Sequence, residues 1–249
     1  MIDLHCHLLP GVDDGARDLP MALDLARASV QNGITQAVLT PHIFGGRWDN
    51  AVSNLTPVFE AFRQSLREHE IPLEVYLGGE VHLLPDAFNL LDVNDLPFVG
   101  GWRGHRVMLL ELPDSHIPVG AMKAVEMFLR RGVLPMIAHP ERNKEVMRNH
   151  KRIEPFIKAG CLMQLTAASV CGLFGAPAHK TSLKLLDAGW ATVVATDAHN
   201  LAHRPPMLAQ ARASLDEMYG AEAGEVLTDA NPRVILEGRP EFPREARAA

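Results

Sequence analysis

The sequence predicts an α/β protein, a distorted β/α (TIM-like) barrel of about seven parallel strands, and three observations lead to this prediction. Short apolar segments alternate with longer amphipathic ones along most of the chain. The amphipathic segments are long enough for the return connection that two parallel strands need. Segments such as VMLLEL (107–112) and ATVVAT (191–196) are apolar at nearly every position, which indicates strands buried on both faces. An open doubly wound sheet is the second choice.

The expected elements follow one another in regular order. The first helix has the clearest ends, because Asp18 can cap it, Pro20 lies in its first turn and Gly33 follows it. The segment between Glu80 and Arg106 is less regular, and we do not expect a full helix there. The strands are expected at 2–5, 35–40, 73–80, 106–112, 134–140, 161–166 and 191–199. The helices are expected at 18–33, 55–70, 119–132, 144–160, 179–189 and 204–220.

Length and composition indicate one globular domain. The chain has 249 residues, and no linker, repeat or low-complexity stretch divides it. We expect a single domain over residues 1–237 and a loose, charged and proline-rich tail over 238–249. Apolar residues make up 47% and charged residues 22%, which is usual for a globular domain.

Charge and hydropathy exclude several classes of partner. The net charge is −6 and no long basic run exists, so nucleic acid is not expected as a partner. No apolar run reaches the ~18 residues of a membrane span, so membrane insertion is not expected. The N-terminus has neither the basic nor the apolar region of a signal peptide. The three cysteines show no CxxC spacing, which favours a reducing, cytoplasmic location. The oligomeric state is left open.

Metal-type side chains stand where the predicted strands end. Functional groups of β/α barrels gather at the carboxyl ends of the strands and in the loops that follow. Five histidines and four carboxylates occupy such positions, whereas the strand at 161–166 supplies no obvious ligand. The nine candidates are His5, His7, Asp14, His42, Glu80, Glu111, His139, Asp197 and His199.

Taken together, these nine residues predict a metal centre. Any single strand-end histidine is more often a structural residue, but four crowded carboxylates would repel one another and lose hydration. Cations would offset both costs. Nitrogen and oxygen donors suit Mn, Fe or Zn, and nine ligands suit two or three divalent ions rather than one. A water that bridges such ions would be acidified toward hydroxide and could attack a phosphate ester.

Two arginines stand close to these motifs and are candidate phosphate ligands. Arg142 follows His139 by three residues, and Arg204 follows His199 by five. A guanidinium presents a planar fork that matches phosphate oxygens. The aromatic loop 44–50 could form the wall of a substrate pocket or simply anchor itself, and the sequence favours neither.

The motifs resemble those of a known family. HCH, the second aspartate of VDDG, TPH, GGE, LLEL, AHPER and TDAH resemble the polymerase-and-histidinol-phosphatase (PHP) superfamily. The opening MIDLHCHLLPGVDDGA, together with HPERN, resembles more closely the bacterial protein-tyrosine phosphatases of capsule and exopolysaccharide gene clusters, the CpsB/YwqE type. The resemblance covers most of the chain, from Met1 to about Arg204.

The resemblance implies a distorted β/α barrel with a trinuclear metal cluster, and it assigns ligands to each ion. His5, His7, Glu80 and Asp197 would hold the first ion. Glu80, Glu111 and His139 would hold the second, and Asp14, His42 and His199 the third. It also implies that Arg142 and Arg204 contact phosphate. The implied substrate is a phosphotyrosine-bearing protein, such as an autophosphorylated bacterial tyrosine kinase that governs polysaccharide export.

The expected function is therefore a metal-dependent phosphotyrosine-protein phosphatase that uses metal-activated hydroxide and regulates capsular or exopolysaccharide biosynthesis. Cysteine-based catalysis is excluded, because no cysteine is followed six residues later by arginine. Two alternatives remain open. One is a small-molecule phosphoesterase of the same superfamily, of the histidinol-phosphate phosphatase type. The other is a regulatory module in which the metal cluster serves only stability.

Overall fold

The computed structural model describes residues 1–239, and within them the chain is an α/β protein with parallel sheets. Hydrogen bonding orders the strands as β1-β2-β4 in one sheet and β10-β9-β8-β7-β5-β3 in the other, all in parallel pairs, while β6 lies antiparallel to β7. The strands are β1 (Ile2–Cys6), β2 (Gln36–Leu39), β3 (His42–Ile43), β4 (Glu74–Leu77), β5 (Glu80–His82), β6 (Gly100–Trp102), β7 (His105–Glu111), β8 (Val133–Ala138), β9 (Leu162–Thr166) and β10 (Val193–Ala195).

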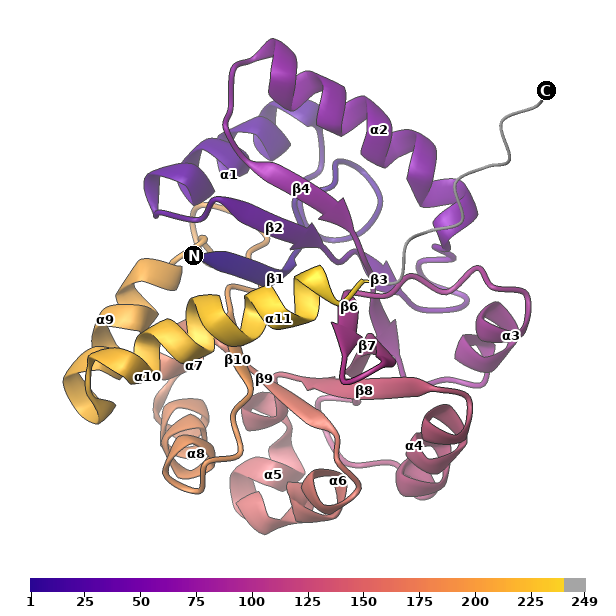
Figure 1. Ribbon diagram of the computed structural model, residues 1–249, viewed down its shortest axis with the longest axis vertical. Helices are drawn as coiled ribbons and strands as arrows, with labels where there is room; N and C mark the ends of the chain where they lie inside the picture. Colours follow the sequence, from indigo (N-terminus) through magenta and orange to yellow (C-terminus); the bar gives the residue numbers. More distant parts are fainter. Residues whose placement is uncertain (240–249) are drawn as a thin grey trace.

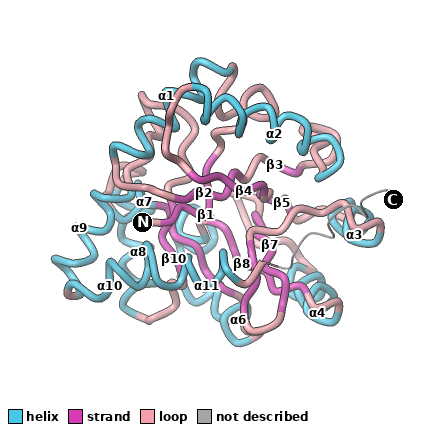
Figure 2. Tube along the Cα trace, turned by 45° about the horizontal axis from the view of Figure 1, so that its top comes forward, coloured by secondary structure: helices cyan, strands magenta, loops and turns pink. Residues whose placement is uncertain are grey.

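Helices surround the strands (Figures 1 and 2). The last helix, α11, crosses the strands near β1 and β6 instead of lying on the outside. The α-helices are α1 (Leu19–Gln31), α2 (Val52–Glu68), α3 (Asp86–Asp92), α4 (Ala121–Arg130), α5 (Lys144–Arg148), α6 (Glu154–Lys158), α7 (Ala167–Val170), α8 (Ala176–Asp187), α9 (Leu208–Tyr219), α10 (Ala221–Glu225) and α11 (Asn231–Glu237). Short helical turns are η1 (Pro140–Arg142), η2 (His150–Ile153) and η3 (Val226–Ala230). None of the helices in residues 1–239 is long and apolar enough to cross a membrane.

Every expected strand segment contains a strand, but the detail differs from the prediction. The segment 73–80 is divided into β4 and β5 at Gly78 and Gly79, and a short β3 follows β2 after Pro41. The antiparallel β6 was not expected. Its hairpin turn places Arg103 and Gly104 at φ 49° and 83°, and tight two-residue turns of β-hairpins require such positive values.

Each of the six predicted helical segments contains helix, and the structure adds helices that were not predicted. Asp18 caps α1, with its side chain accepting a hydrogen bond from Met21 N. The helical segment 144–160 consists of α5, η2 and α6, and the irregular segment after Glu80 contains only the seven-residue α3. The short α7 and the two C-terminal helices α10 and α11 were not predicted. The predicted tail begins at Gly238, and its residues 240–249 lie outside the described residues.

The two sheets meet where β1 passes β10. Asp197 N donates to His5 O at 2.7 Å, and His7 N donates to Ala198 O at 2.8 Å. Asp3, which is buried in β1, accepts hydrogen bonds from Thr196 N and Thr196 Oγ1 at 2.9 and 2.5 Å. These bonds hold β1 and β10, the first and last strands in residues 1–239, side by side. The hydrogen-bonded strand order nevertheless gives two sheets and not one closed ring.

A small cluster, here called the inner core, packs strand side chains against α11. It contains Ile2, Leu4, Val38, Val99, Val107, Leu109, Leu134, Met136, Ala138, Leu162, Val193, Ile235 and Leu236. Along β7 and β8 the residues between these belong to a larger cluster that includes residues of the surrounding helices. The helix approaches β6 closely, because a Cβ on Gly101 would lie 1.7 Å from Gly238 O. Only glycine fits at that contact.

A register shift in β1 separates the inner core from the residues that follow it. Ile2 and Asp3 pair with Gln36 and Ala37, but the next pair is Cys6 with Leu39, so β1 carries one extra residue. Such a bulge changes which face the following side chains occupy. Leu4 therefore packs in the inner core, while the adjacent His5 belongs to the polar cluster described next.

Candidate metal centre

The structure brings all nine predicted ligands into one cluster. They come from the end of β1 and the loop after it, from β3, β5 and the end of β7, and from the segments after β8 and β10. The imidazoles of the five histidines are buried, and so are the carboxylates of Glu80 and Asp197. The side chain of Glu111 is 15% exposed and that of Asp14 is 46% exposed, so the cluster opens to solvent on their side.

Four acceptor atoms meet at the deepest point of the cluster. His5 Nε2 and His7 Nε2 are 3.2 Å apart. Glu80 Oε2 lies 3.3 and 3.4 Å from these two nitrogens, and Asp197 Oδ1 lies 3.3 and 3.5 Å from them. All four side chains are fully buried. The lone pairs of these four buried atoms point at the same small space, so a cation or a proton is needed there to offset their repulsion.

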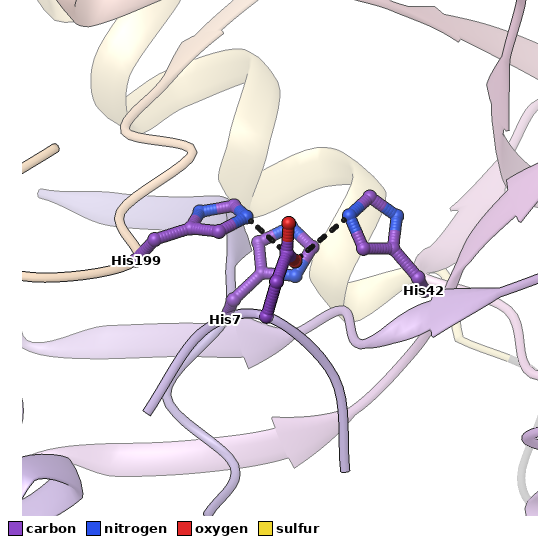
Figure 3. A group of neighbouring side chains, drawn as sticks. His7, His42 and His199 are labelled. Carbon is purple, nitrogen blue, oxygen red and sulfur yellow. Dashed lines mark ion pairs between the residues drawn. The ribbon is translucent and has the colours of Figure 1, made fainter. Parts of the chain in front are cut away.

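A second group of ligands lies toward the opening. Figure 3 shows His7, His42 and His199 turned toward one another. Asp14 Oδ1 joins them, at 3.3 Å from His42 Nε2 and 3.4 Å from His199 Nε2. The ligand atoms of these four residues all lie within 4.8 Å of one another, which is close enough for one ion to contact them all. Asp14 belongs to this group, whereas the neighbouring Asp13 contacts Nδ1 of His7.

Glu80 connects the remaining candidates. Its Oε1 lies 2.8 Å from His139 Nε2, and its Oε2 lies 3.0 Å from His42 Nδ1. Glu111 approaches the same two histidines, with its oxygens 3.7 Å from His42 Nδ1 and 3.9 Å from His139 Nε2. Glu80 thus lies between the two histidines, with one carboxylate oxygen toward each of them.

The groups of residues that could hold an ion share more members than the ligand assignment implied by the family resemblance. The groups able to hold an ion are His7–Asp14–His42–His199, His5–His7–Glu80, His5–His139–Asp197 and His42–Glu80–Glu111. His7 therefore also joins the outer group, and His139 also groups with Asp197. The assignment of ligands to individual ions stays a prediction.

The donor set fits metal ions, because several buried atoms have no partner. Glu80 Oε2, Asp197 Oδ1, His42 Nδ1 and His199 Nε2 make no hydrogen bond to any described residue. Buried polar atoms are rarely left unpaired, since each costs about 1–3 kcal/mol. His199 Nδ1 lies 3.0 Å from the Asp197 carbonyl oxygen, which can only accept, so His199 Nε2 is left with its lone pair facing the cluster.

The pKa values of the histidines also indicate that the cluster favours positive charge. Burial opposes the charged form of His42, but the carboxylates of Asp14 and Glu80 beside its ring nitrogens raise its pKa to about 10. The pKa values of His7 and His139 are also raised, against burial, by their carboxylate partners. Burial lowers the pKa of His199 to about 4. Protons on some imidazoles thus balance the carboxylates, and metal ions would replace them.

The two predicted arginines lie at one edge of the cluster and meet on one oxygen. Asp197 Oδ2 accepts a hydrogen bond from Arg142 Nη1 at 2.5 Å and another from Arg204 Nη2. The arginine side chains are 24% and 23% exposed. A guanidinium carries five N–H donors, so each retains donors for a further anion. Arg204 Nε is among the buried atoms without a partner in the described chain.

Three polar residues that support the ligands were not predicted. Asp13 Oδ2 accepts from His7 Nδ1 at 2.7 Å and from His42 N at 3.0 Å. Gln164 contacts His5, and His82 Nδ1 lies 3.1 Å from Glu111 Oε2. A lone amide in the apolar segment CLMQLT (161–166) was a usable signal. The role of Asp13 was hidden, because both aspartates of VDDG have the same chemistry.

The loop 44–50 covers the side of the cluster near β3 and β5. Phe44 and Trp48 form a tight antiparallel bridge. The Trp48 ring stacks on His42 with centroids 4.7 Å apart, and the Phe44 ring stacks on His82 at 4.2 Å. Arg47 Cζ lies over the Trp48 ring, 4.0 Å from its centroid. The two aromatic side chains thus cover a candidate ligand and the support of another.

Fold and site together define an α/β protein whose histidine- and carboxylate-rich cluster is suited to divalent metal ions. A family model described as capsular polysaccharide synthesis, CpsB/CapC, matches residues 1–237. The chain belongs to the CpsB/CapC family.

Curated relatives match most of the chain. The chain is 32% identical over 248 residues to tyrosine-protein phosphatase YwqE of Bacillus subtilis (strain 168), an alignment that covers 97% of this chain and 94% of that protein. It is 31% identical to the putative tyrosine-protein phosphatase CapC of Staphylococcus aureus, over 84% of this chain and 81% of that protein. It is 28% identical to tyrosine-protein phosphatase CpsB of Streptococcus pneumoniae, over 95% and 98%.

Solved structures agree with this family membership. A chain from the crystal structures of YwqE from B. subtilis and CpsB from S. pneumoniae, described as unique metal-dependent tyrosine phosphatases, superposes with a TM-score of 0.89. The two chains are 31% identical, and the match covers 97% of this chain and 96% of that one. Organophosphorus hydrolase from Deinococcus radiodurans, at 14% identity and a TM-score of 0.57, shares the fold over 94% of this chain and 91% of its own.

Proposed function

We propose that this chain is a metal-dependent phosphotyrosine-protein phosphatase. The observation that carries the proposal is the convergence of nine nitrogen and oxygen ligands, with unpaired buried acceptor atoms among them, beside two arginines. Relatives of similar length are named tyrosine-protein phosphatases, and a structure that superposes closely is described as metal-dependent.

The proposal includes a distorted barrel of seven parallel strands as the scaffold. In this scaffold, β2 and β3 count as one kinked strand, and β4 and β5 count as a second. The order of the strand pairs supports this reading. β2 pairs with β4 just as β3 pairs with β5. The hydrogen bonds between the ends of β1 and β10 would then close the ring. Residues 1–237 would form this one domain.

In the proposed reaction, some residues would position the phosphate ester and others would stabilise its charge. Arg142 and Arg204 would direct their remaining N–H donors at phosphate oxygens and hold the ester against the ligand cluster. The buried walls around Glu80 and Asp197 would exclude bulk water and so strengthen these interactions. Two or three divalent Mn, Fe or Zn ions held by the nine ligands would supply Lewis acidity toward the phosphoryl group and lower the pKa of a coordinated water.

The proposal extends to the biological setting. The substrate would be a phosphotyrosine-bearing protein, such as an autophosphorylated bacterial tyrosine kinase, and the process would be capsular or exopolysaccharide biosynthesis. The family description supports the process. A cytoplasmic location is supported by the cysteines, since Cys6, Cys161 and Cys171 are all free thiols.

The test compares substrates and metal states in one preparation. Protein stripped by a chelator and protein reloaded with Mn²⁺ are each given a phosphotyrosine peptide and histidinol phosphate. We expect turnover only after reloading, with the peptide strongly preferred. His42→Ala should lower kcat by at least about 100-fold, whereas His69→Ala, at an exposed histidine of α2's C-terminal end, should not.

The same assay separates the alternatives. Preference for histidinol phosphate would replace the proposal with a small-molecule phosphoesterase, since that enzyme shares the metal site and differs in the pocket. If no phosphomonoester is hydrolysed and Asp197→Ala only lowers the melting temperature, the cluster serves stability alone. Equal turnover by metal-free and reloaded protein would contradict both phosphatase proposals.

A further inference from the structure

Strand β9 supplies no metal ligand, yet one of its side chains contacts two candidate ligands. Gln164 is fully buried and lies two residues after Leu162, on the same face of β9 as this residue of the inner core. Its Oε1 lies 2.9 Å from His5 Nδ1 and 3.2 Å from the backbone N of His139. One oxygen of β9 thus connects a ligand of β1 to the ligand that follows β8.

The backbone contact determines which way the amide points. The N–H of His139 can only donate, so the Gln164 atom that faces it must be the carbonyl oxygen. The same oxygen then accepts from His5, and His5 carries its proton on Nδ1. His5 Nε2 keeps its lone pair and faces Glu80 and Asp197, each 3.3 Å away. This is the tautomer that metal coordination through Nε2 requires.

The second hydrogen bond supports an unusual backbone conformation. His139 has φ 30° and ψ 53°, in the left-handed region that residues other than glycine rarely adopt. Strain of this kind, of order 1–3 kcal/mol, persists only where the surroundings enforce it. Gln164 Oε1 bonds the N–H of His139, and Arg142 N bonds its carbonyl at 2.9 Å. These two bonds flank the strained residue and turn its side chain toward Glu80.

We propose that Gln164 is a positioning residue that fixes the tautomer of His5 and the conformation of His139 and so prepares two ligands of the candidate metal centre before any ion binds. Its role depends on the carbonyl oxygen alone, because Nε2 makes no hydrogen bond to any residue in 1–239. A glutamate at this position would keep the oxygen acceptor, and a leucine of similar size would not. The proposal assumes the metal centre of the proposed function but not its substrate.

The direct test reads the tautomer of His5 in metal-free protein. Long-range ¹H–¹⁵N correlation spectra of ¹⁵N-histidine-labelled protein distinguish the two tautomers, and a His5→Asn sample assigns the signal. We expect His5 to be protonated on Nδ1 in the wild type and in Gln164→Glu, and to lose that preference in Gln164→Leu. A wild-type His5 protonated on Nε2 would overturn the proposal without need of any variant, even if the leucine variant fails to fold.

Calorimetric titration with Mn²⁺ gives a second readout that does not involve turnover. We expect Gln164→Leu to bind Mn²⁺ about 10–100-fold more weakly, the usual cost of losing a residue that orients a ligand. Gln164→Glu should restore the affinity, and Gln64→Leu, an exposed glutamine on α2, should leave it unchanged. Wild-type affinity in a folded Gln164→Leu protein would refute the proposal. Absence of phosphatase activity would refute the proposed function but leave these two readouts intact.

Discussion

At the scale of single residues, the candidate centre is a set of imidazoles whose lone pairs are directed by hydrogen bonds on the opposite ring nitrogen. Asp13 holds Nδ1 of His7, Gln164 holds that of His5, and the Asp197 carbonyl faces that of His199. Each bond leaves Nε2 toward the cluster. Partners of this kind are common around metal-binding histidines, because they orient the ring and set the tautomer.

Metal affinity should increase with pH. His7, His42 and His139 have raised pKa values, so the metal-free protein holds protons on them that an ion must displace. The displacement costs less as the pH rises toward those pKa values, and binding should weaken as the pH falls. Calorimetric titration with Mn²⁺ in buffers of different ionisation enthalpy should show proton release at neutral pH. Identical heats in all buffers would speak against protonated imidazoles in the metal-free site.

The buried thiol of Cys161 makes a separate prediction about alkaline stability. Burial raises its pKa from 9.0 to about 12. The folded state therefore favours the neutral thiol, and stability is fully present below pH 9 and is lost as the pH rises toward 12. The Cys161→Ala variant has no thiol to ionise at this position. Its melting temperature should therefore approach or pass that of the wild type as the pH rises from 9 toward 12. Parallel melting temperatures across that range would refute the prediction.

At the scale of elements, much of the layout could be predicted, because each strand and most helices carry a local signal. Asp18 before α1 and the continuous apolar runs of β7 and β8 are examples. The division of 73–80 at Gly78 and Gly79 depends on their neighbours, since a Cβ on Gly78 would lie 2.6 Å from Val38 Cγ1. The sequence of α11 carries no local signal that separates it from a surface helix. Its packing over the inner core depends on contacts with strands that are distant in sequence.

Helix α11 should contribute to stability without affecting the metal centre. Ile235 is fully buried in the inner core, whereas the adjacent Val234 is 53% exposed. We expect Ile235→Ala to lower the free energy of unfolding by about 2–5 kcal/mol, through lost burial and the cavity left behind. Val234→Ala should change it by less than about 0.5 kcal/mol. Urea unfolding measures both variants, and equal losses would show that α11 does not pack as described.

At the scale of the whole molecule, the members of the cluster were predictable but their arrangement was not. Strand-end positions sufficed to select all nine, since parallel strands bring their carboxyl ends to one side. Sequence could not show that both arginines meet on Asp197, or that Asp13 supports two ligands. The Arg142 contact joins residues that are 55 positions apart, and the Asp13 contact depends on which of two neighbouring, chemically equal residues faces His7. They depend on side-chain geometry that no local pattern records.

Metal removal should destabilise the entire fold, because the ligands come from both sheets. Ions that bind only the folded state stabilise it by about 2.7 kcal/mol at one hundred times their dissociation constant. For a chain of this size each kcal/mol corresponds to about 2–4 °C in melting temperature. Differential scanning calorimetry should therefore show a melting temperature roughly 5–10 °C lower after chelation. An unchanged melting temperature would mean that the cluster does not hold ions tightly in the folded protein.

The most direct test of the metal centre is anomalous diffraction from crystals grown with Mn²⁺. The expected result is two or three anomalous peaks among the nine ligands, near Glu80 and Asp197 and beside Asp14. Crystals without such peaks, in which the nine side chains keep the positions described here, would contradict the claim that this cluster is built to hold metal ions.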